Sequence, residues 1–383
     1  MRFSVLLPTR NGERLLEGCM RSVLSQDYDD LELVVSDNAS DEPTRAVIAS
    51  FEGDPRLKTV RLDEPVEVTD NWNRAYEASS GDYVLILGDD DYLLPGYFET
   101  VGGLIDRWDS PDCLTYNGYA FAFPGTLAGR EASHYADPFA AWDERLPAEG
   151  ELPRHARMQV LEDMFRFVFR IHLNLQTTLV ARSAVERLPA GFLKPPFPDF
   201  YALGALMMAA DRWVYSPAKP IVIGISPKSF GHTIHDESRS EGLGYLGIST
   251  EFDGQLPGNE VINGTWLCLK ELKRDFPRQL AGVDVDRSEY VVQQVYFWYL
   301  RWRLGQLSGR RLAGLLRLLR ARDLPLLGRA LAQRVSPRMV RRNVGMDTGD
   351  PVRYLWPGLK PVPEVHDIAE FARWLERREP APS

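Results

Sequence analysis

From residue 3 to residue 91, two kinds of hydrophobic pattern take turns along the chain. Short apolar runs rich in strand-forming residues end at turn residues, and between them apolar residues recur at the spacing of one helix face. A strand–helix alternation of this kind predicts a mostly parallel α/β sheet flanked by helices. The predicted strands cover residues 3–9, 31–35, 56–62 and 83–87, and the predicted helices cover residues 11–26, 41–51 and 68–81.

Polar clusters follow three of these predicted strands. Pro8-Thr9-Arg10-Asn11 follows the first, Asp37-Asn38 the second, and Asp89-Asp90-Asp91 the fourth. In open parallel sheets, ligands bind beyond the carboxyl ends of the strands. We therefore expect the three clusters to converge on one crevice.

The run Asp89-Asp90-Asp91 places three like charges directly after a buried strand. Adjacent carboxylates repel, and removing them from water costs free energy unless a positive charge lies nearby. A divalent cation such as Mg²⁺ or Mn²⁺ is commonly held by one or two carboxylates together with substrate phosphates. The position after a strand favours such a metal–diphosphate site. A solvated acidic turn or helix cap is the alternative.

The other two clusters also allow two interpretations each. Asp37 can accept a hydrogen bond from a ribose or a base, although "SDNASD" is also good turn chemistry. Thr9 and Arg10 can contact a base or a phosphate, or they form a strand-to-helix turn. Three polar strand ends together favour a ligand site more than any one of them does.

After Asp91 the pattern loosens. Residues 123–151 are rich in Pro, Gly and charge, which predicts an excursion or lid. Asp199 follows a Pro-rich loop and heads a helix predicted over residues 200–210. It is either a general base or an N-terminal carboxylate favoured by the helix dipole. His232 and His235 lie in a predicted loop, where they would bind a metal and a phosphate or have no such role.

Beyond residue 251 the pattern is mostly helical, and its charge is unusual. Residues 300–343 contain 12 Arg and one Asp, about +11, whereas the net charge of the whole chain is −9. Leu312, Leu315, Leu316 and Leu319 share one helix face in this segment. Either the segment lies peripherally on an anionic membrane, or its leucine face packs in a bundle against the rest of the chain or a second subunit.

Composition narrows the class of protein. The 383 residues are 44% hydrophobic and 26% charged, which is typical of a globular protein with a sizeable core. No run approaches the length of a membrane span, and the N-terminus resembles a first strand more than a signal peptide. Three widely spaced cysteines argue against a disulfide framework or zinc site and favour a reducing, cytoplasmic location. The negative net charge disfavours a general nucleic-acid binder.

Several motifs together resemble family 2 inverting glycosyltransferases of the GT-A fold. They are the strand ending in Pro-Thr, "SVLSQ", "VVSDNASD", the helix of "NWNRAYEASSG" and the strand "DYVLILGDDDYLLPG". The likeness is close from Arg2 to Asp91 and looser to about Gly231. It implies a Rossmann-like GT-A catalytic domain over residues 1–250, with a nucleotide-sugar half to about residue 95 and an acceptor half after it. Residues 251–383 would form the helical, Arg-rich region.

The resemblance also implies roles for individual residues. Asp199 matches the position of the catalytic base, although Pro198 replaces the acidic residue that often precedes it. Many members read Asp-x-Asp-Asp, and here Gly88 stands at the first of those positions, so which two carboxylates bind the Mn²⁺ or Mg²⁺ ion stays open. His232 lies where related enzymes place a further metal or phosphate ligand. The implied metal ligands are Asp90, Asp91 and His232, and the implied nucleotide-sugar contacts are Pro8, Thr9, Arg10, Asp37, Asn38, Asn73, Arg74 and Asp89.

The activity implied is transfer of a sugar from a nucleotide-diphospho-sugar, with UDP favoured, to an acceptor hydroxyl with inversion. The acceptor would be a saccharide or a lipid-linked saccharide in surface polysaccharide or glycolipid synthesis. A sugar nucleotidyltransferase would open with a Gly-rich loop, and a dinucleotide oxidoreductase needs GxGxxG; the first strand is followed by neither. A phosphatase with an Asp nucleophile would carry DxD after its first strand. A non-catalytic nucleotide-sugar-binding or assembly protein would not need Asp199.

Overall fold

The computed structural model describes residues 1–127, 130–140, 142–229, 252–303, 305–334 and 358–378. Its larger sheet confirms the predicted α/β class, with strands in the order β3-β2-β1-β4-β10-β6-β11-β9. The first four strands of that order are parallel. Their bounds are β3 (Leu57–Arg61), β2 (Leu31–Asp37), β1 (Phe3–Thr9), β4 (Tyr83–Ile86), β10 (Thr178–Ala181), β6 (Cys113–Tyr116), β11 (Trp213–Ser216) and β9 (Gly150–Glu151).

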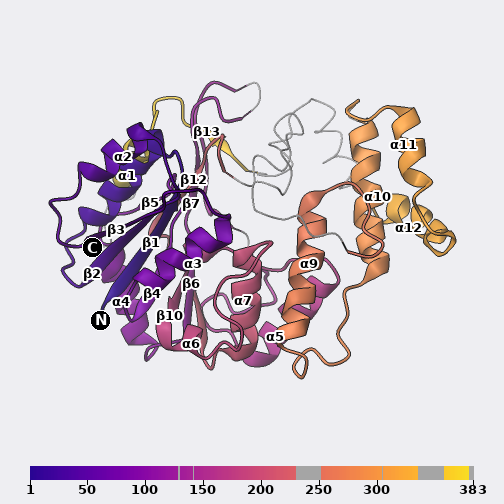
Figure 1. The fold of residues 1–383 in the computed structure, drawn as a ribbon, viewed down its shortest axis with the longest axis horizontal. Helices are drawn as coiled ribbons and strands as arrows, with labels where there is room; N and C mark the ends of the chain where they lie inside the picture. The colour runs from indigo at the N-terminus through magenta and orange to yellow at the C-terminus, as the bar shows by residue number, and fades with distance from the viewer. Residues whose placement is uncertain (128–129, 141, 230–251, 304, 335–357, 379–383) are drawn as a thin grey trace.

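In the parallel half the inner strands are buried on both faces, whereas the edge strand β3 is partly exposed. Every residue of β2 and β4 is buried, as expected for strands covered by helices on both sides. Helices connect these strands and shield the sheet (Figure 1). They are α1 (Glu13–Leu24), α2 (Glu42–Ala49) and α3 (Val68–Ala78), close to the three helices predicted from periodicity, and α4 (Tyr97–Arg107), which was not predicted.

The second half of the larger sheet departs from simple alternation. Strand β10 inserts between β4 and β6 and runs antiparallel to both. It begins where the short 3₁₀ helix η1 (Leu175–Thr177) ends, and η1 lies against β4. This insertion brings the chain around residue 175 next to the end of β4. The helices of this half are α5 (Arg154–Phe165), α6 (Arg182–Glu186) and α7 (Pro198–Ala209).

A smaller five-stranded sheet contains the short strand that follows the aspartate run. Its order is β13-β8-β7-β12-β5, and β12 pairs antiparallel with β5, immediately after Asp91. Two short strands, β8 and β9, lie in the stretch 123–151 that was predicted to be an excursion. The bounds are β13 (Lys360–Pro361), β8 (His134–Ala136), β7 (Tyr119–Ala122), β12 (Ile221–Ile225) and β5 (Tyr92–Leu93).

The C-terminal part is mostly helical, as predicted. Helices α9, α10, α11 and α12 extend from α7 at the end of the molecule far from β3 (Figure 1). Leu312, Leu315, Leu316 and Leu319 are partly buried against the main core, so much of the leucine face is already covered within the chain. Among the described helices, none combines the length and apolar composition needed to cross a membrane. The bounds are α9 (Glu260–Asp275), α10 (Arg287–Arg303), α11 (Gly309–Leu316) and α12 (Leu324–Arg334).

The last described helix returns to the N-terminal half. Helix α15 (Ile368–Glu376) contacts α1, β5 and β12, and its yellow ribbon lies beside α1 in Figure 1. Phe371 stacks on Phe121 of β7 with ring centroids 5.0 Å apart. The division near residue 250 stays a prediction, but the described residues after 358 pack with the smaller sheet.

Candidate functional site

The first carboxylate of the aspartate run lies against the loop that follows β1. The hydroxyl of Thr9 donates a 3.0 Å hydrogen bond to Oδ2 of Asp89. Gly12 packs against this hydrogen bond and leaves no space for a side chain. A Cβ atom there would lie 2.3 Å from Oδ2 of Asp89 and 2.7 Å from the Thr9 hydroxyl. The structure therefore brings the first and third polar clusters together, as the parallel topology predicted.

The second carboxylate contacts the loop that follows β12. Ser229 donates a 2.6 Å hydrogen bond from its hydroxyl to Oδ2 of Asp90. Gly224 lets β12 pass this close, since a Cβ atom there would lie 1.9 Å from the carbonyl oxygen of Asp90. The positive charge of Lys228, in the same loop as Ser229, acts to lower the pKa of Asp89.

The third carboxylate points into the protein. Asp91 is 2% exposed, and its two oxygens accept backbone N–H bonds from Gly88 at 2.7 Å and from Gly224 at 3.0 Å. These bonds tie the loop after β4 to strand β12. Asp89 and Asp90, which are both partly exposed, are the two carboxylates that a ligand can reach.

Burial and mutual repulsion dominate the electrostatics of this loop. Desolvation raises the pKa of all three carboxyl groups, and the charge of Asp90 raises the pKa of Asp89 and Asp91 further. A nearby divalent cation would reverse that effect. Within the residues that the structure describes, no three His, Cys, Asp or Glu side chains form a ready metal cage. His232 lies outside the described residues.

The second polar cluster is held by bonds within the protein. Asp37 is 1% exposed, forms an ion pair with Arg61, and accepts a 2.9 Å bond from the Ser40 N–H. Asn38 makes a pair of bonds with the backbone of Val66, at 2.8 and 2.9 Å. These contacts fix the end of β2 and the approach to α3.

The remaining predicted nucleotide contacts have different surroundings. The Asn73 amide of α3 donates to the carbonyl of Leu193 at 3.2 Å, whereas Arg74 and Arg10 are exposed. Pro8 is half-buried in β1, opposite Ser36 of β2. Arg10 therefore offers an exposed positive charge directly after β1.

Asp199 is bonded to the first residue of η1. Its Oδ1 accepts a 3.3 Å bond from the N–H of Leu175, the first residue of η1, which lies against β4. Pro198 is compatible with the first turn of α7, where no N–H is needed. Desolvation raises the pKa of Asp199 to about 7. A carboxyl group with a pKa near neutrality is suited to accept a proton.

Sequence reasoning missed the contributors from the loop after β12. In "SPKSFGHTIH" the sequence analysis singled out only His232 and His235. Yet Ser226 and Ser229 hydrogen-bond to Asp90, and the positive charge of Lys228 acts on Asp89. No local pattern distinguishes these residues from ordinary loop residues. Only the pairing of β12 with β5 brings them to the aspartate run, more than a hundred residues away in the sequence.

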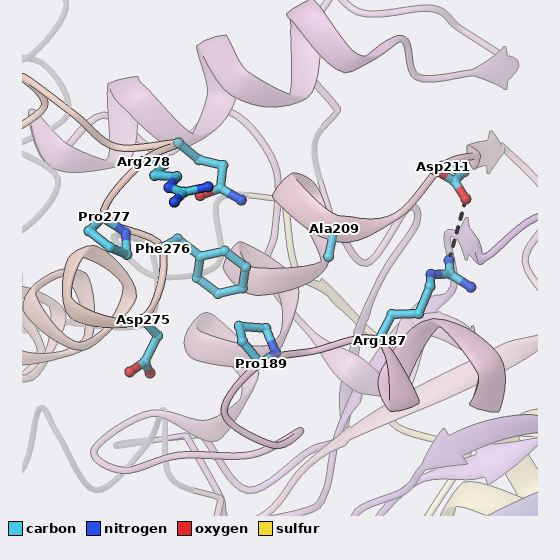
Figure 2. A pocket seen from close by; sticks show the side chains of 9 residues that line it. Arg187, Pro189, Ala209, Asp211, Asp275, Phe276, Pro277 and Arg278 are labelled. Carbon is cyan, nitrogen blue, oxygen red and sulfur yellow. Dashed lines mark ion pairs between the residues drawn. The ribbon is translucent and has the colours of Figure 1, made fainter.

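A separate hollow of about 560 Å³ lies near the amino ends of strands in the larger sheet (Figure 2). Arg187 borders it and forms ion pairs with Asp112 and Asp211, which precede β6 and β11. These are the amino ends of two parallel strands, whereas Asp89 and Asp90 follow the carboxyl end of β4. None of the residues that line the hollow belongs to the loops that follow β1, β4 and β12.

The chain is similar to known proteins in sequence and in fold. Residues 4–127 match the family model described as glycosyl transferase family 2. Over 134 residues the chain is 34% identical to GalNAc(5)-diNAcBac-PP-undecaprenol beta-1,3-glucosyltransferase of Campylobacter jejuni, covering 34% of this chain and 40% of that protein. Over 116 residues it is 28% identical to poly(ribitol-phosphate) beta-N-acetylglucosaminyltransferase TarS of Staphylococcus aureus, covering 29% and 20%.

Among solved structures, two crystal structures of S. aureus TarS residues 1–349 share the fold. One covers 87% of this chain and 91% of that chain at 16% identity with a TM-score of 0.50. The other, in complex with UDP-GlcNAc, covers 96% and 98% at 15% identity with the same TM-score. The matched segment thus spans two fifths or less of the curated relatives, while the fold likeness extends over most of the chain.

Proposed function

Residues 4–127 belong to glycosyl transferase family 2, and from this premise we propose that the chain transfers a sugar from a nucleotide-diphospho-sugar to an acceptor hydroxyl, with inversion at the anomeric carbon. One observation carries the proposal. The loop after β4 presents two partly exposed carboxylates, Asp89 and Asp90. The Asp199 carboxyl group, whose pKa is raised to about 7, is bonded to η1, and η1 lies against β4.

The donor diphosphate would bind at Asp89 and Asp90. Both are hard oxygen ligands, they repel each other, and Gly12 leaves space for a close approach, so the residues present fit a divalent Mn²⁺ or Mg²⁺ ion. Such an ion would neutralise the charge that develops on the leaving diphosphate. Lys228 and Arg10 lie where they can add positive charge to the same group. Asp91 would contribute by fixing the loop through the amides of Gly88 and Gly224.

Asp199 would act as the general base. Its carboxylate takes the proton of the acceptor hydroxyl, and the oxygen attacks the anomeric carbon from the face opposite the diphosphate. Because the attacking oxygen comes from the acceptor, no enzyme nucleophile is needed. The Leu175 N–H bond orients the carboxylate while leaving its second oxygen for the acceptor.

The donor nucleotide and the acceptor are proposed from the relatives. UDP is favoured because the TarS structure of the same fold was solved with UDP-GlcNAc. The Campylobacter enzyme is named for a polyprenol-linked saccharide, and TarS for a poly(ribitol-phosphate) chain. We therefore propose a saccharide or lipid-linked saccharide acceptor in surface polysaccharide or glycolipid synthesis.

A melting screen tests the donor half of this proposal. The purified protein is heated with UDP-, GDP-, dTDP- and CMP-sugars, each with Mn²⁺, with Mg²⁺ or with EDTA. Ligands that bind the native state raise Tm by mass action. We expect a metal-dependent increase in Tm with one nucleotide class. An unchanged Tm with every donor and metal would contradict a donor site. Binding without transfer in any acceptor mixture would favour the rival interpretation, a nucleotide-sugar-binding protein.

A further inference from the structure

The chain exposes apolar side chains that the proposed chemistry does not use, and one of them contacts the residue that follows Asp199. Val168 is 45% exposed and Phe169 is 46% exposed. The ring of Phe169 lies 5.8 Å from the ring of Phe200, the residue that follows Asp199. We call Val168, Phe169 and Phe200 the Phe169 platform.

The backbone that presents the platform is unusual. Helix α5 ends in a Schellman motif, in which the Val168 N–H bonds to the Asp163 carbonyl at 2.9 Å and the Phe167 N–H bonds to the Met164 carbonyl at 2.8 Å. Glycine normally occupies the left-handed position of this motif, but here Phe167 has φ of 56°. A bulky residue in this conformation indicates a locally disfavoured backbone that the surroundings must hold.

Three contacts hold this turn. The ring of Phe167 is buried, 6.1 Å from the ring of Tyr290 in α10, and the Asp286 N–H bonds to the Phe165 carbonyl at 2.8 Å. On the other side of Phe169, Arg170 forms ion pairs with Asp163 and Asp143. The flanking residues are thus anchored, while Val168 and Phe169 project outward.

We propose that the Phe169 platform binds the apolar C–H face of the acceptor's sugar ring. This inference rests on the proposed function, because it takes the acceptor hydroxyl to lie at Asp199. Phe200 adjoins Asp199 in the chain and contacts Phe169, so the platform begins next to the base. The reacting hydroxyl belongs to a sugar ring of the acceptor, so that ring is the part of the acceptor that would lie nearest to Asp199.

Other occupants fit less well. A stable protein interface buries about 800 Å² on each partner, far more than three side chains can supply. A lipid chain would need a longer apolar path, and Arg170 and the exposed Arg166 flank the platform with charge. A pyranose ring matches both the small apolar area and the polar border.

The test measures sugar binding separately from donor binding. Saturation-transfer NMR is recorded with methyl pyranosides of glucose, N-acetylglucosamine, galactose and mannose, in the presence of UDP and Mn²⁺. In the unmodified protein, we expect saturation of the ring C–H protons of at least one glycoside. Phe169→Ala should weaken that binding roughly tenfold, the order expected for loss of one aromatic contact. Phe169→Tyr should restore it.

Two comparisons keep the result specific. Leu318→Ala removes a 53% exposed leucine at the far end of the molecule and should leave glycoside binding unchanged. The Mn²⁺-dependent increase in Tm with UDP should be equal in all variants. Its absence in the unmodified protein would count against the proposed function, not against the platform.

Three outcomes would overturn the platform: no saturation with any of the four methyl glycosides, equal binding by Phe169→Ala, or a dependence on Phe169 seen only with octyl glycosides. The last result would identify an aliphatic chain as the occupant.

Discussion

The pKa values of the carboxyl groups are raised by different means at the proposed donor site and at the proposed acceptor site. On the donor side, three aspartates crowd one loop, and the charge of Asp90 adds to the effect of burial on Asp89 and Asp91. On the acceptor side, Asp199 stands alone, and desolvation is the only influence that raises its pKa. Repulsion among several carboxylates is relieved by a cation, whereas a solitary desolvated carboxylate is relieved by a proton. The proposed function uses this difference: it assigns metal binding to the aspartate run and proton transfer to Asp199.

The largest effect is expected from removing a donor-side charge. Asp90→Asn should abolish both transfer and the metal-dependent increase in Tm with the nucleotide, because one of the two exposed carboxylates is lost. Differential scanning fluorimetry and a transfer assay measure the two effects. Asp27→Asn, at an exposed site in the loop before β2, is the matched control and should change neither. Retained metal-dependent binding in Asp90→Asn would contradict the assignment.

The acceptor-side variant should separate binding from chemistry. Asp199→Asn keeps the shape of the side chain but cannot accept the proton, so transfer should fall by roughly 10²–10⁴-fold, the usual contribution of a general base. The increase in Tm with nucleotide and metal should persist. Loss of donor binding in this variant would show that the two sides are not independent.

The pH dependence sharpens the same contrast. With a pKa of about 7, Asp199 is mostly protonated at pH 5.5 and mostly ionised at pH 8, so kcat/KM should rise with pH through 7 and then level off. A profile that is flat between pH 5.5 and 8 would argue against Asp199 as the base.

Stability should vary with pH in the opposite direction. The folded state raises the pKa of Asp199 from 3.8 to about 7, so it binds this proton more tightly than the unfolded state does. Stability therefore falls as the pH rises between these two values, and the loss is complete above pH 7. Asp199→Asn removes that cost. Its Tm should exceed that of the unmodified protein at pH 8, and the difference should shrink toward pH 5. Equal Tm differences at both pH values would mean that the carboxyl group is not desolvated.

The smallest effect on chemistry is expected at Asp91, whose role here is to hold the loop. In Asp91→Asn, the amide can accept a hydrogen bond through only one atom, so the N–H of Gly88 or Gly224 loses its partner. A lost buried partner costs about 1–3 kcal/mol. Urea denaturation should show this loss of stability, while metal affinity changes less than in Asp90→Asn. The reverse ranking would make Asp91 a metal ligand.

Much of the N-terminal half could be predicted from the sequence because strands and helices alternate regularly along it, and its strands pair in parallel. Each strand end carries a local polar cluster, and parallel pairing of β1 with β2 and β4 brings those clusters to one edge. The fold class and the closeness of Thr9 to Asp89 follow from that regularity. The individual roles within the aspartate run did not follow, because the amide of Gly224 comes from a strand 133 residues away.

The acceptor half depends on long-range pairings that leave no local pattern. The antiparallel insertion of β10 brings η1 to β4 and so carries Leu175 to Asp199. The pairing of β12 with β5 brings Ser229 to Asp90. The positive φ of Phe167 contradicts the preference for glycine at that position, so periodicity alone does not reveal the exposed ring of Phe169.

The central claim, direct attack by an acceptor oxygen activated at Asp199, is tested most directly by the stereochemistry of the product. The protein is incubated with the α-linked nucleotide sugar that raises its Tm, and the anomeric proton of the first sugar product is followed by NMR before mutarotation. The account predicts that the β-anomer appears first, whether the attacking oxygen belongs to water or to an acceptor. Initial release of the α-anomer would indicate two successive displacements through an enzyme nucleophile, and it would contradict the role given to Asp199.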